Sequence, residues 1–516
     1  MFLNPQTRHI VPRWRDFRTT LALGELRNLT EPHSLSETNK DTLDRLIADW
    51  RNNPTVWHAG DLLSSAFVLG RTHDLQDVTD FVINNRKNSP RSLAALADEI
   101  RNPRPAPVIE VNPIISEESL HKSVHGIRAR LREEPRNAIQ WVELARLYSV
   151  VGDLERGHRA MAVAAALGPD HRFVVRSAAR FFLHEKEINK ALKVIRTASG
   201  AKNDPWLLAS EIAVASASSS PSLLAKEGRS RNEDDSLTLF ERNELSSALA
   251  TLDMENGKNR KARQLFRRAL EAPNENSVAQ VEWANRQIGG LEIEKPELFQ
   301  LPRSFEANAQ LSLVQGEWRS AIAQGIAWLN DQQFSKRPAL FTSYVSSLVE
   351  DHDRSIEILR TSLRANPGDP MLINNLAFAL ASQNNLEEAI ETLDTVDPEN
   401  VSGLAAVTLT ATQGLVLFRL GYPDKGRELY HRSRDRAGNL GAQSYRLMAD
   451  LYLAREELIA GTPGCQVIAQ RALANAAESI EKDVALIAEQ VSKVLEKSRS
   501  QKRAEPVRGG KRRIGG

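Results

Sequence analysis

The feature that most constrains this 516-residue chain is a pattern of large and small residues that recurs about every 34 positions. Large side chains, small side chains, a turn glycine and a proline follow one another in a fixed order. In the unit starting at residue 138 they are Trp141, Leu144, Ala145, Tyr148, Gly152, Gly157, Met161, Ala164 and Pro169. A chain of short repeated units buries its apolar faces by stacking neighbours, so a single central core is not expected.

The pattern returns several times between about residues 138 and 440. Its later members are Val175, Phe182, Ala191 and Ile195; Leu249, Ala250, Gly257, Ala262, Phe266 and Ala269; Gly316 and Ala321; Ser355, Leu359, Ser362 and Pro367; Leu376, Ala377, Leu380, Ala389 and Leu393; and Gly414, Leu417, Gly421, Gly426 and Tyr430. We therefore expect six or seven units, with residues 374–393 the closest match to the pattern.

These offsets resemble the tetratricopeptide repeat, a 34-residue unit of two antiparallel helices. Gly157 stands where that family usually has alanine, and both residues are small enough for two helices to approach closely. The resemblance implies an all-α chain that forms a right-handed superhelical solenoid. It also implies an inner face lined by the first helix of each unit.

Composition divides the chain into five expected parts. Apolar residues at helical spacing predict an N-terminal helical module over 1–100, and a set of degenerate repeats is one interpretation of it. Four prolines in residues 101–113 predict a stiff linker over 101–115. The solenoid then occupies 116–440, with a polar loop insertion at 214–235. Capping helices follow over 441–496, and a basic disordered tail over 497–516.

Apolar residues spaced four and three apart mark the end of the predicted helical part. They are Leu473, Ala477, Ile480, Val484, Ile487, Val491 and Val494. One interpretation is a terminal helix that covers the last repeat, because solenoids need a capped end. The other is a coiled-coil helix through which the chain forms a homodimer.

We find no motif that indicates catalysis or a cofactor. The nucleophile-elbow, phosphate-loop, dinucleotide and zinc-protease patterns are all missing from the sequence. Glu117, His121 and His125 share one helical face, but such spacing is common on exposed helices, so we expect no metal site. Cys465 is the single cysteine, which excludes an internal disulfide, and we interpret it as an incidental thiol.

The resemblance places partner binding on the inner face, where an extended peptide or a helix of another protein would lie. The candidate residues are Arg146, Arg176, Arg180, Arg337, Tyr344, Asn374, Asn375, Phe378 and Arg419. Asn374 and Asn375 are of special interest, because side-chain amides can hold an extended backbone through paired donor and acceptor contacts. The leading hypothesis is a non-catalytic scaffold for protein–protein interaction.

The uneven distribution of charge supports a second hypothesis, that the chain is a nucleic-acid-associated subunit. Residues 497–516 carry eight basic side chains and one acidic one, whereas the other 496 residues carry a net charge of −5. Such a subunit would use the arginines of the inner face together with the tail, where the candidate contacts to a nucleic acid are Lys502, Arg503, Arg508, Lys511, Arg512 and Arg513. A regulatory subunit of an enzyme complex is a third possibility. We find no apolar run of membrane-spanning length and no signal segment, so we expect a cytoplasmic protein.

Overall fold

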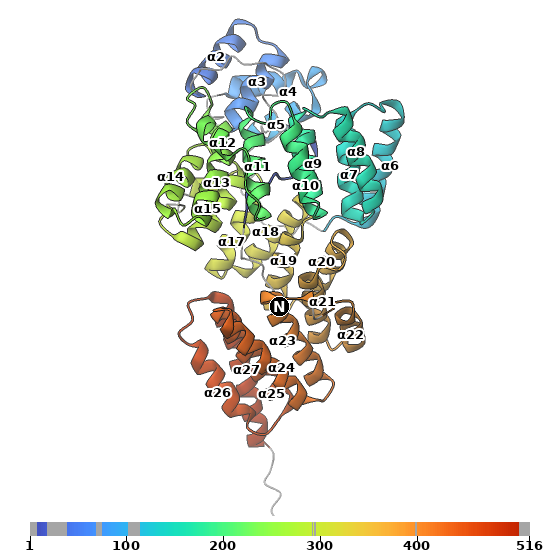
Figure 1. Cartoon of the computed structure of the whole chain (residues 1–516), viewed down its shortest axis with the longest axis vertical. Helices are drawn as coiled ribbons and strands as arrows, with labels where there is room; N and C mark the ends of the chain where they lie inside the picture. Colours follow the sequence, from blue (N-terminus) through green and yellow to red (C-terminus); the bar gives the residue numbers. More distant parts are fainter. Residues whose placement is uncertain are drawn as a thin grey trace, which may run out of the picture. The chain divides into compact units, whose positions relative to one another are not determined.

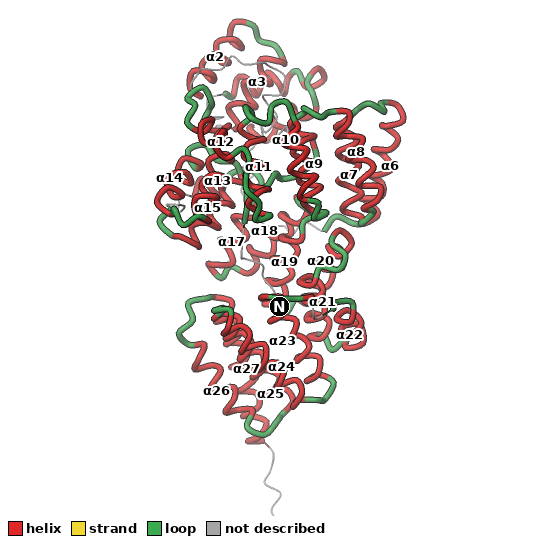
Figure 2. The backbone as a smooth tube through the Cα atoms, viewed as in Figure 1, coloured by secondary structure: helices red, strands yellow, loops and turns green. Residues whose placement is uncertain are grey.

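The computed structural model describes residues 8–17, 39–68, 75–101, 114–291, 293, 296–397 and 400–504. Their regular secondary structure is helical throughout (Figures 1 and 2). The chain divides into two compact units. The described residues of the N-terminal unit are 8–308 and 326–335, and those of the C-terminal unit are 309–325 and 336–504.

The N-terminal unit begins with four helices that share a hydrophobic cluster around Leu62, Leu63, Val78 and Val82. They are α2 (Asn39–Asn52), α3 (Val56–Val68), α4 (Gln76–Asn84) and α5 (Arg91–Arg101). The helices that follow are α6 (Glu117–Glu133), α7 (Ala138–Val151), α8 (Leu154–Leu167), α9 (Arg172–His184), α10 (Ile188–Thr197), α11 (Pro205–Ala217), α12 (Ala225–Asn232), α13 (Leu239–Glu255), α14 (Asn259–Ala269), α15 (Glu275–Ile288) and α16 (Pro296–Phe299).

The boundary between the units crosses α17 (Phe305–Gln315) and α18 (Trp318–Asp331). The remaining helices of the C-terminal unit are α19 (Lys336–Leu348), α20 (His352–Ala365), α21 (Pro370–Ser382), α22 (Leu386–Asp394), α23 (Gly403–Arg419), α24 (Pro423–Asn439), α25 (Gln443–Ala460), α26 (Cys465–Ala476) and α27 (Lys482–Ala504). Each repeat predicted from the sequence coincides with one helix pair, from α7–α8 to α23–α24.

Short polar side chains start many of these helices. Asp153 accepts a hydrogen bond from the backbone of Arg156 at the start of α8, and Asp351 does the same for Arg354 at α20. Such caps satisfy backbone N–H groups that a helix leaves without a partner. Gly152 ends α7 in the left-handed conformation at φ 84°. The short turns between paired helices therefore follow from the local sequence.

The glycines at the predicted small positions differ in how closely they hold two helices together. At Gly426 an added Cβ would lie 2.5 Å from Phe418 and 2.8 Å from the carbonyl oxygen of Gly414. At Gly157 the nearest atom, on Phe181, would be 3.5 Å away, an ordinary contact distance. The α23–α24 pair therefore requires glycine, whereas the α7–α8 pair has room for alanine.

Four local expectations differ from the structure. Residues 8–16 are extended, although 1–100 reads as a helical module, because Pro12 lacks an N–H group and opposes helix. The expected loop at 214–235 holds the end of α11 and all of α12, whose Gly228 packs against Ile212 and Leu245. A break over 477–481 divides the apolar stripe between α26 and α27. Helix α27 continues to Ala504, into the expected tail.

Candidate peptide-binding site

Residues 8–17, here called the N-terminal segment, cross the first helices of successive repeats in the N-terminal unit, and residues 8–16 are neither helix nor strand. Arg8, Ile10 and Trp14 are 5%, 1% and 0% exposed. The segment contacts side chains of α7, α9, α11, α13, α15, α17 and α18, all more than 100 residues away in the sequence. It therefore occupies the face on which the repeat pattern predicted partner binding.

Three arginines of the N-terminal segment meet three buried carboxylates. Arg8 approaches Glu306 at 2.9 Å through both Nε and Nη2, and Arg13 Nη2 lies 2.7 Å from the same side chain. Arg15 bridges Asp331, with Nε 2.7 Å from Oδ2, and Glu275, with Nη1 2.6 Å from Oε1. Guanidinium forks match carboxylates in this geometry, which makes each contact directional as well as charged.

Side-chain amides hold the backbone of the same segment. Gln280 Nε2 donates to the carbonyl oxygen of Arg8 at 2.6 Å, and Asn276 Nδ2 donates to that of Val11 at 3.2 Å. The N–H of Phe17 donates to Glu143 at 2.7 Å. Because these contacts are made to the main chain, they recognise extended polypeptide whatever its side chains are.

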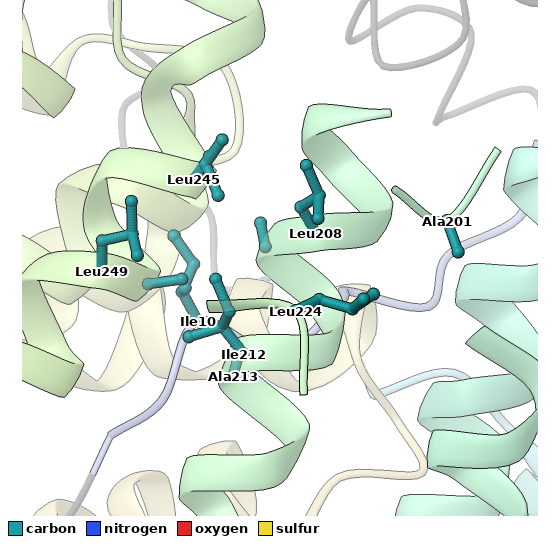
Figure 3. Packing of buried hydrophobic residues seen from close by; sticks show 10 residues of the cluster. Ile10, Ala201, Leu208, Ile212, Ala213, Leu224, Leu245 and Leu249 are labelled. Carbon is teal, nitrogen blue, oxygen red and sulfur yellow. The ribbon is translucent and has the colours of Figure 1, made fainter. Parts of the chain in front are cut away.

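Apolar side chains of the N-terminal segment pack at three separate places on the helices. Ile10 lies among residues of α11 and α13, including Ile212 and Leu249 (Figure 3). Trp14 makes edge-on ring contacts with Phe181 and Phe334, at centroid distances of 5.8 and 5.2 Å. Phe17 meets Phe173 at 5.0 Å. We call the whole contact surface the acidic cradle, defined by Glu143, Phe173, Phe181, Glu275, Asn276, Gln280, Glu306, Asp331 and Phe334.

Burial and charge act in opposite directions on the ionisable groups of the acidic cradle. Burial alone would raise the pKa of Asp331, but Arg15, Arg13 and Arg303 lower this pKa below its ordinary value. Burial raises the pKa of Glu143 despite its contact with Arg146. Burial also lowers the pKa of Arg13, against the attraction of Glu306. The carboxylate of Asp331 thus depends on the arginine beside it to remain charged in a buried position.

Sequence comparison identifies the family that the repeat pattern resembles. Residues 349–411, which hold most of α20, all of α21 and α22 and the start of α23, match the family described as tetratricopeptide repeat. Residues 349–411 form a tetratricopeptide-repeat region. The predicted all-helical repeat fold is confirmed.

Two solved structures are similar to this chain at low sequence identity. Yeast Tom70 is 13% identical, with a TM-score of 0.31, over 76% of this chain and 94% of its own. The APC/C hetero-tetramer Cut9–Hcn1 is 13% identical, with a TM-score of 0.40, over 88% of this chain and 93% of that one. None of the curated proteins matches the sequence.

Three arginines predicted on the inner face border the acidic cradle. Arg146 pairs with Glu143 at 3.1 Å, and Arg176 pairs at 2.7 Å with Glu244, which also accepts from Asn276. Arg180 lies over the ring of Phe334 at 4.7 Å. These arginines contact residues that surround the N-terminal segment and help to fix them in place. These three predicted residues therefore lie beside the residues that contact the N-terminal segment.

The candidate residues of the C-terminal unit are largely engaged inside the fold. Asn374 and Asn375 are both 0% exposed, hydrogen-bond to each other at 3.1 Å, and Asn374 also accepts from Thr412. Phe378 packs against Tyr452 at 5.4 Å, and Arg419 pairs with Glu456 at 2.7 Å. Arg337 lies half-buried on α19. Amides held in this way are not oriented toward an extended peptide.

Helix α27 covers part of this inner face. Tyr344 of α19 donates to Asp483 of α27 at 2.6 Å, and Gln490 donates to the carbonyl oxygen of Leu348 at 2.8 Å. Val484, Ile487 and Val491 are completely buried. The apolar stripe of α27 is thus packed within its own chain, which favours the covering helix over the coiled-coil interpretation.

The remaining candidates lie on the surface or outside the described residues. Glu117 and His121 form an exposed i,i+4 pair at 3.5 Å. Lys502 and Arg503 fall in the last turn of α27, and Arg508, Lys511, Arg512 and Arg513 lie beyond the described residues, as does the proline-rich run 102–113. Among the described helices, none combines the length and apolarity needed to cross a bilayer.

The sequence analysis missed the residues that bind the N-terminal segment. Asn276 and Gln280 stand four apart on α15, so they share one helical face, and both are buried, at 2% and 0% exposure. The segment also carried a signal of its own: Arg13, Trp14 and Arg15 follow Pro12, and side chains of an extended chain alternate between two sides. This alternation sends Arg13 and Arg15 toward carboxylates and Trp14 toward aromatic rings.

Proposed function

We propose that this tetratricopeptide-repeat protein is a non-catalytic interaction scaffold whose acidic cradle binds an extended segment of polypeptide. Proteins built from this repeat are typically protein-binding scaffolds. The single observation that carries the proposal is the N-terminal segment itself, whose backbone carbonyl oxygens are held by Gln280 and Asn276. A surface that holds ten residues of its own chain in this way has the geometry needed to hold those of a partner.

The chemistry of the acidic cradle supports a basic ligand. Glu275, Glu306 and Asp331 are buried beside the N-terminal segment, and Asp331 also has an arginine from outside the segment beside it, Arg303 at 3.0 Å. Removing a counter-charge from a buried carboxylate costs several kcal/mol. A segment that supplies arginines removes that penalty. An acidic segment would add like charges at the same place, so it is excluded as a ligand.

Peptide binding to the full chain tests the proposal. The variant R13A/R15A weakens the hold on the chain's own segment, and a fluorescent peptide of residues 8–17 is then titrated against it. We expect saturable binding at one site per chain. Adding N276A/Q280A removes two hydrogen bonds to the peptide backbone and two from the Arg8 guanidinium, and weakens binding by at least about tenfold.

The control variant in the same background is N256A, whose exposed amide follows α13 and donates to the carbonyl oxygen of Leu252. It should leave peptide affinity unchanged. Circular dichroism verifies that each variant retains its helices. If the folded R13A/R15A chain does not bind the peptide, the acidic cradle is not a peptide-binding surface.

A further inference from the structure

The acidic cradle is occupied by the protein's own chain, and this inference rests on the function proposed above. We propose that the N-terminal segment is a reversible internal ligand. The partner that replaces it is then a protein segment of the same chemistry: an aromatic residue between two arginines, with a third arginine five residues before the first of the pair. Arg8, Arg13, Trp14 and Arg15 define that spacing.

The N-terminal segment makes the kinds of contact that a bound peptide ligand makes. The contacts to its backbone that the structure describes come from side chains, namely those of Glu143, Asn276 and Gln280. Among the helices that it touches, α7, α9, α11, α13 and α15 contact one another in repeat order, and α15 shares an apolar cluster with α17 through Val278, Ala279 and Ala307. Helix pairs stabilise their neighbours along a solenoid, so the segment can leave without removing a link from the stack.

The carboxylates of the acidic cradle determine which partner segments can replace the N-terminal segment. Glu306 receives the guanidinium groups of both Arg8 and Arg13, and Arg15 binds Glu275 and Asp331 at once. A lysine ammonium cannot form the same forked contacts, because it is a point charge on a flexible stem. The acidic cradle should therefore prefer arginine over lysine at each of the three positions.

The surroundings of Trp14 match their occupant less closely than the arginine sites do. Trp14 packs between Phe181 and Phe334, but its buried indole N–H has no hydrogen-bond partner among the described residues. An unmet donor lowers affinity for the segment. The internal ligand therefore fits the acidic cradle less tightly than an ideal ligand would, as an exchangeable occupant should.

The covalent link between the N-terminal segment and the rest of the chain offsets the affinity that the unmet indole N–H removes. A tethered segment has an effective concentration in the millimolar range, so it outcompetes a free partner that carries the same residues. We infer that the uncut chain is largely closed to partners. Binding is expected to increase when the N-terminal segment is released from its tether or weakened.

The experiment separates the tether from the contacts. A specific protease site is inserted between Phe17 and Asn39, and the purified full chain is compared before and after cleavage. The probe is the fluorescent peptide of residues 8–17, with a scrambled peptide of equal composition as the control. We expect at least tenfold tighter apparent binding after cleavage, together with loss of the cut N-terminal fragment.

Each other outcome has a definite meaning. Equal binding before and after cleavage would show that the tether does not close the acidic cradle, while leaving the proposed function intact. Unfolding on cleavage, or a cut fragment that never exchanges although the R13A/R15A chain binds peptide, identifies a permanent structural strap and overturns the inference. Absence of binding to both the cut chain and the R13A/R15A chain overturns the proposed function as well.

Peptide variants test the partner chemistry in the cleaved chain. Replacing the three arginines by lysine keeps the net charge and should weaken binding by at least tenfold. Equal affinity of the lysine peptide would contradict selection by guanidinium geometry and leave only attraction between opposite charges. Raising the salt concentration distinguishes these cases further, because a purely electrostatic contact weakens steeply.

Discussion

At the residue scale, Glu306 is the centre of the acidic cradle because two arginines share its carboxylate. Replacing it by glutamine keeps the shape but leaves two buried guanidinium groups without their counter-charge. We expect E306Q to lower the free energy of unfolding of the N-terminal unit by about 3–5 kcal/mol, measured by urea denaturation. E428Q, on a carboxylate that is 70% exposed, should change it by less than about 1 kcal/mol. Equal stability of the two variants would contradict the assigned role of Glu306.

Asp331 gives the acidic cradle a pH dependence of known sign. Its pKa is lowered when Arg15 is bound, so the bound state holds fewer protons than the empty one. Peptide affinity for the R13A/R15A chain should therefore be greatest above the pKa of the empty site and fall as the pH is lowered through it. Titrations from pH 7 to below the ordinary aspartate pKa of about 4 measure this fall. D331N should flatten the profile, and an affinity that rises on acidification would refute the assignment.

At the scale of elements, the facing glycines of α23 and α24 make a sharp comparison possible. G426A would force a methyl group against Phe418 and the backbone of Gly414, and should destabilise the C-terminal unit by about 1–3 kcal/mol. G157A occupies the same repeat position in α8 with room to spare, and should be neutral or slightly stabilising, because alanine favours helix. Thermal unfolding of both variants measures the difference. Similar losses of thermal stability in G426A and G157A would mean that the helices of α23–α24 and α7–α8 are equally close.

Helix α27 is held to the inner face of the C-terminal unit through a buried hydroxyl. Burial, then the neighbouring Asp483, raises the pKa of Tyr344 well above its ordinary value, so the phenol stays protonated and donates to the carboxylate. Y344F removes that donor and should destabilise the contact by about 1–3 kcal/mol. Hydrogen exchange of α27 should become faster in Y344F and remain unchanged in Y422F, whose ring is 55% exposed. Unchanged exchange in Y344F would exclude this anchor.

The repeat helices could be predicted from sequence because their determinants are local. Small residues at fixed offsets and capping groups such as Asp153 and Asp351 lie within or beside the helices they define. The apolar stripe at the C-terminal end was locally regular as well, yet the chain breaks at 477–481 and leaves Ile480 94% exposed. Periodicity alone did not reveal that break.

The candidate site was predictable only in part, because its contacts join residues far apart in the sequence. Arg15 and Asp331 are 316 positions apart, and nothing near either residue indicates the other. The family pattern placed binding on the first helices and predicted amides that grip an extended backbone. The structure has this chemistry at Asn276 and Gln280, whereas Asn374 and Asn375 bond within the fold.

At the scale of the whole molecule, each unit, taken separately, covers part of its own inner face. The N-terminal unit does so with residues 8–17, through buried ion pairs, and the C-terminal unit with α27, through an apolar stripe and Tyr344. The first covering is extended and strongly charged, and the second is helical and mostly apolar. The N-terminal unit therefore has the properties expected of an exchangeable peptide site.

Photo-cross-linking tests the central claim most directly. A peptide of residues 8–17 with benzoylphenylalanine in place of Trp14 is bound to the R13A/R15A chain and irradiated. If the acidic cradle binds extended basic segments, mass spectrometry should locate the cross-links around Phe181 of α9 and Phe334, the two rings that contact Trp14. Cross-links spread over other helices, or the same yield with a scrambled peptide, would contradict the account.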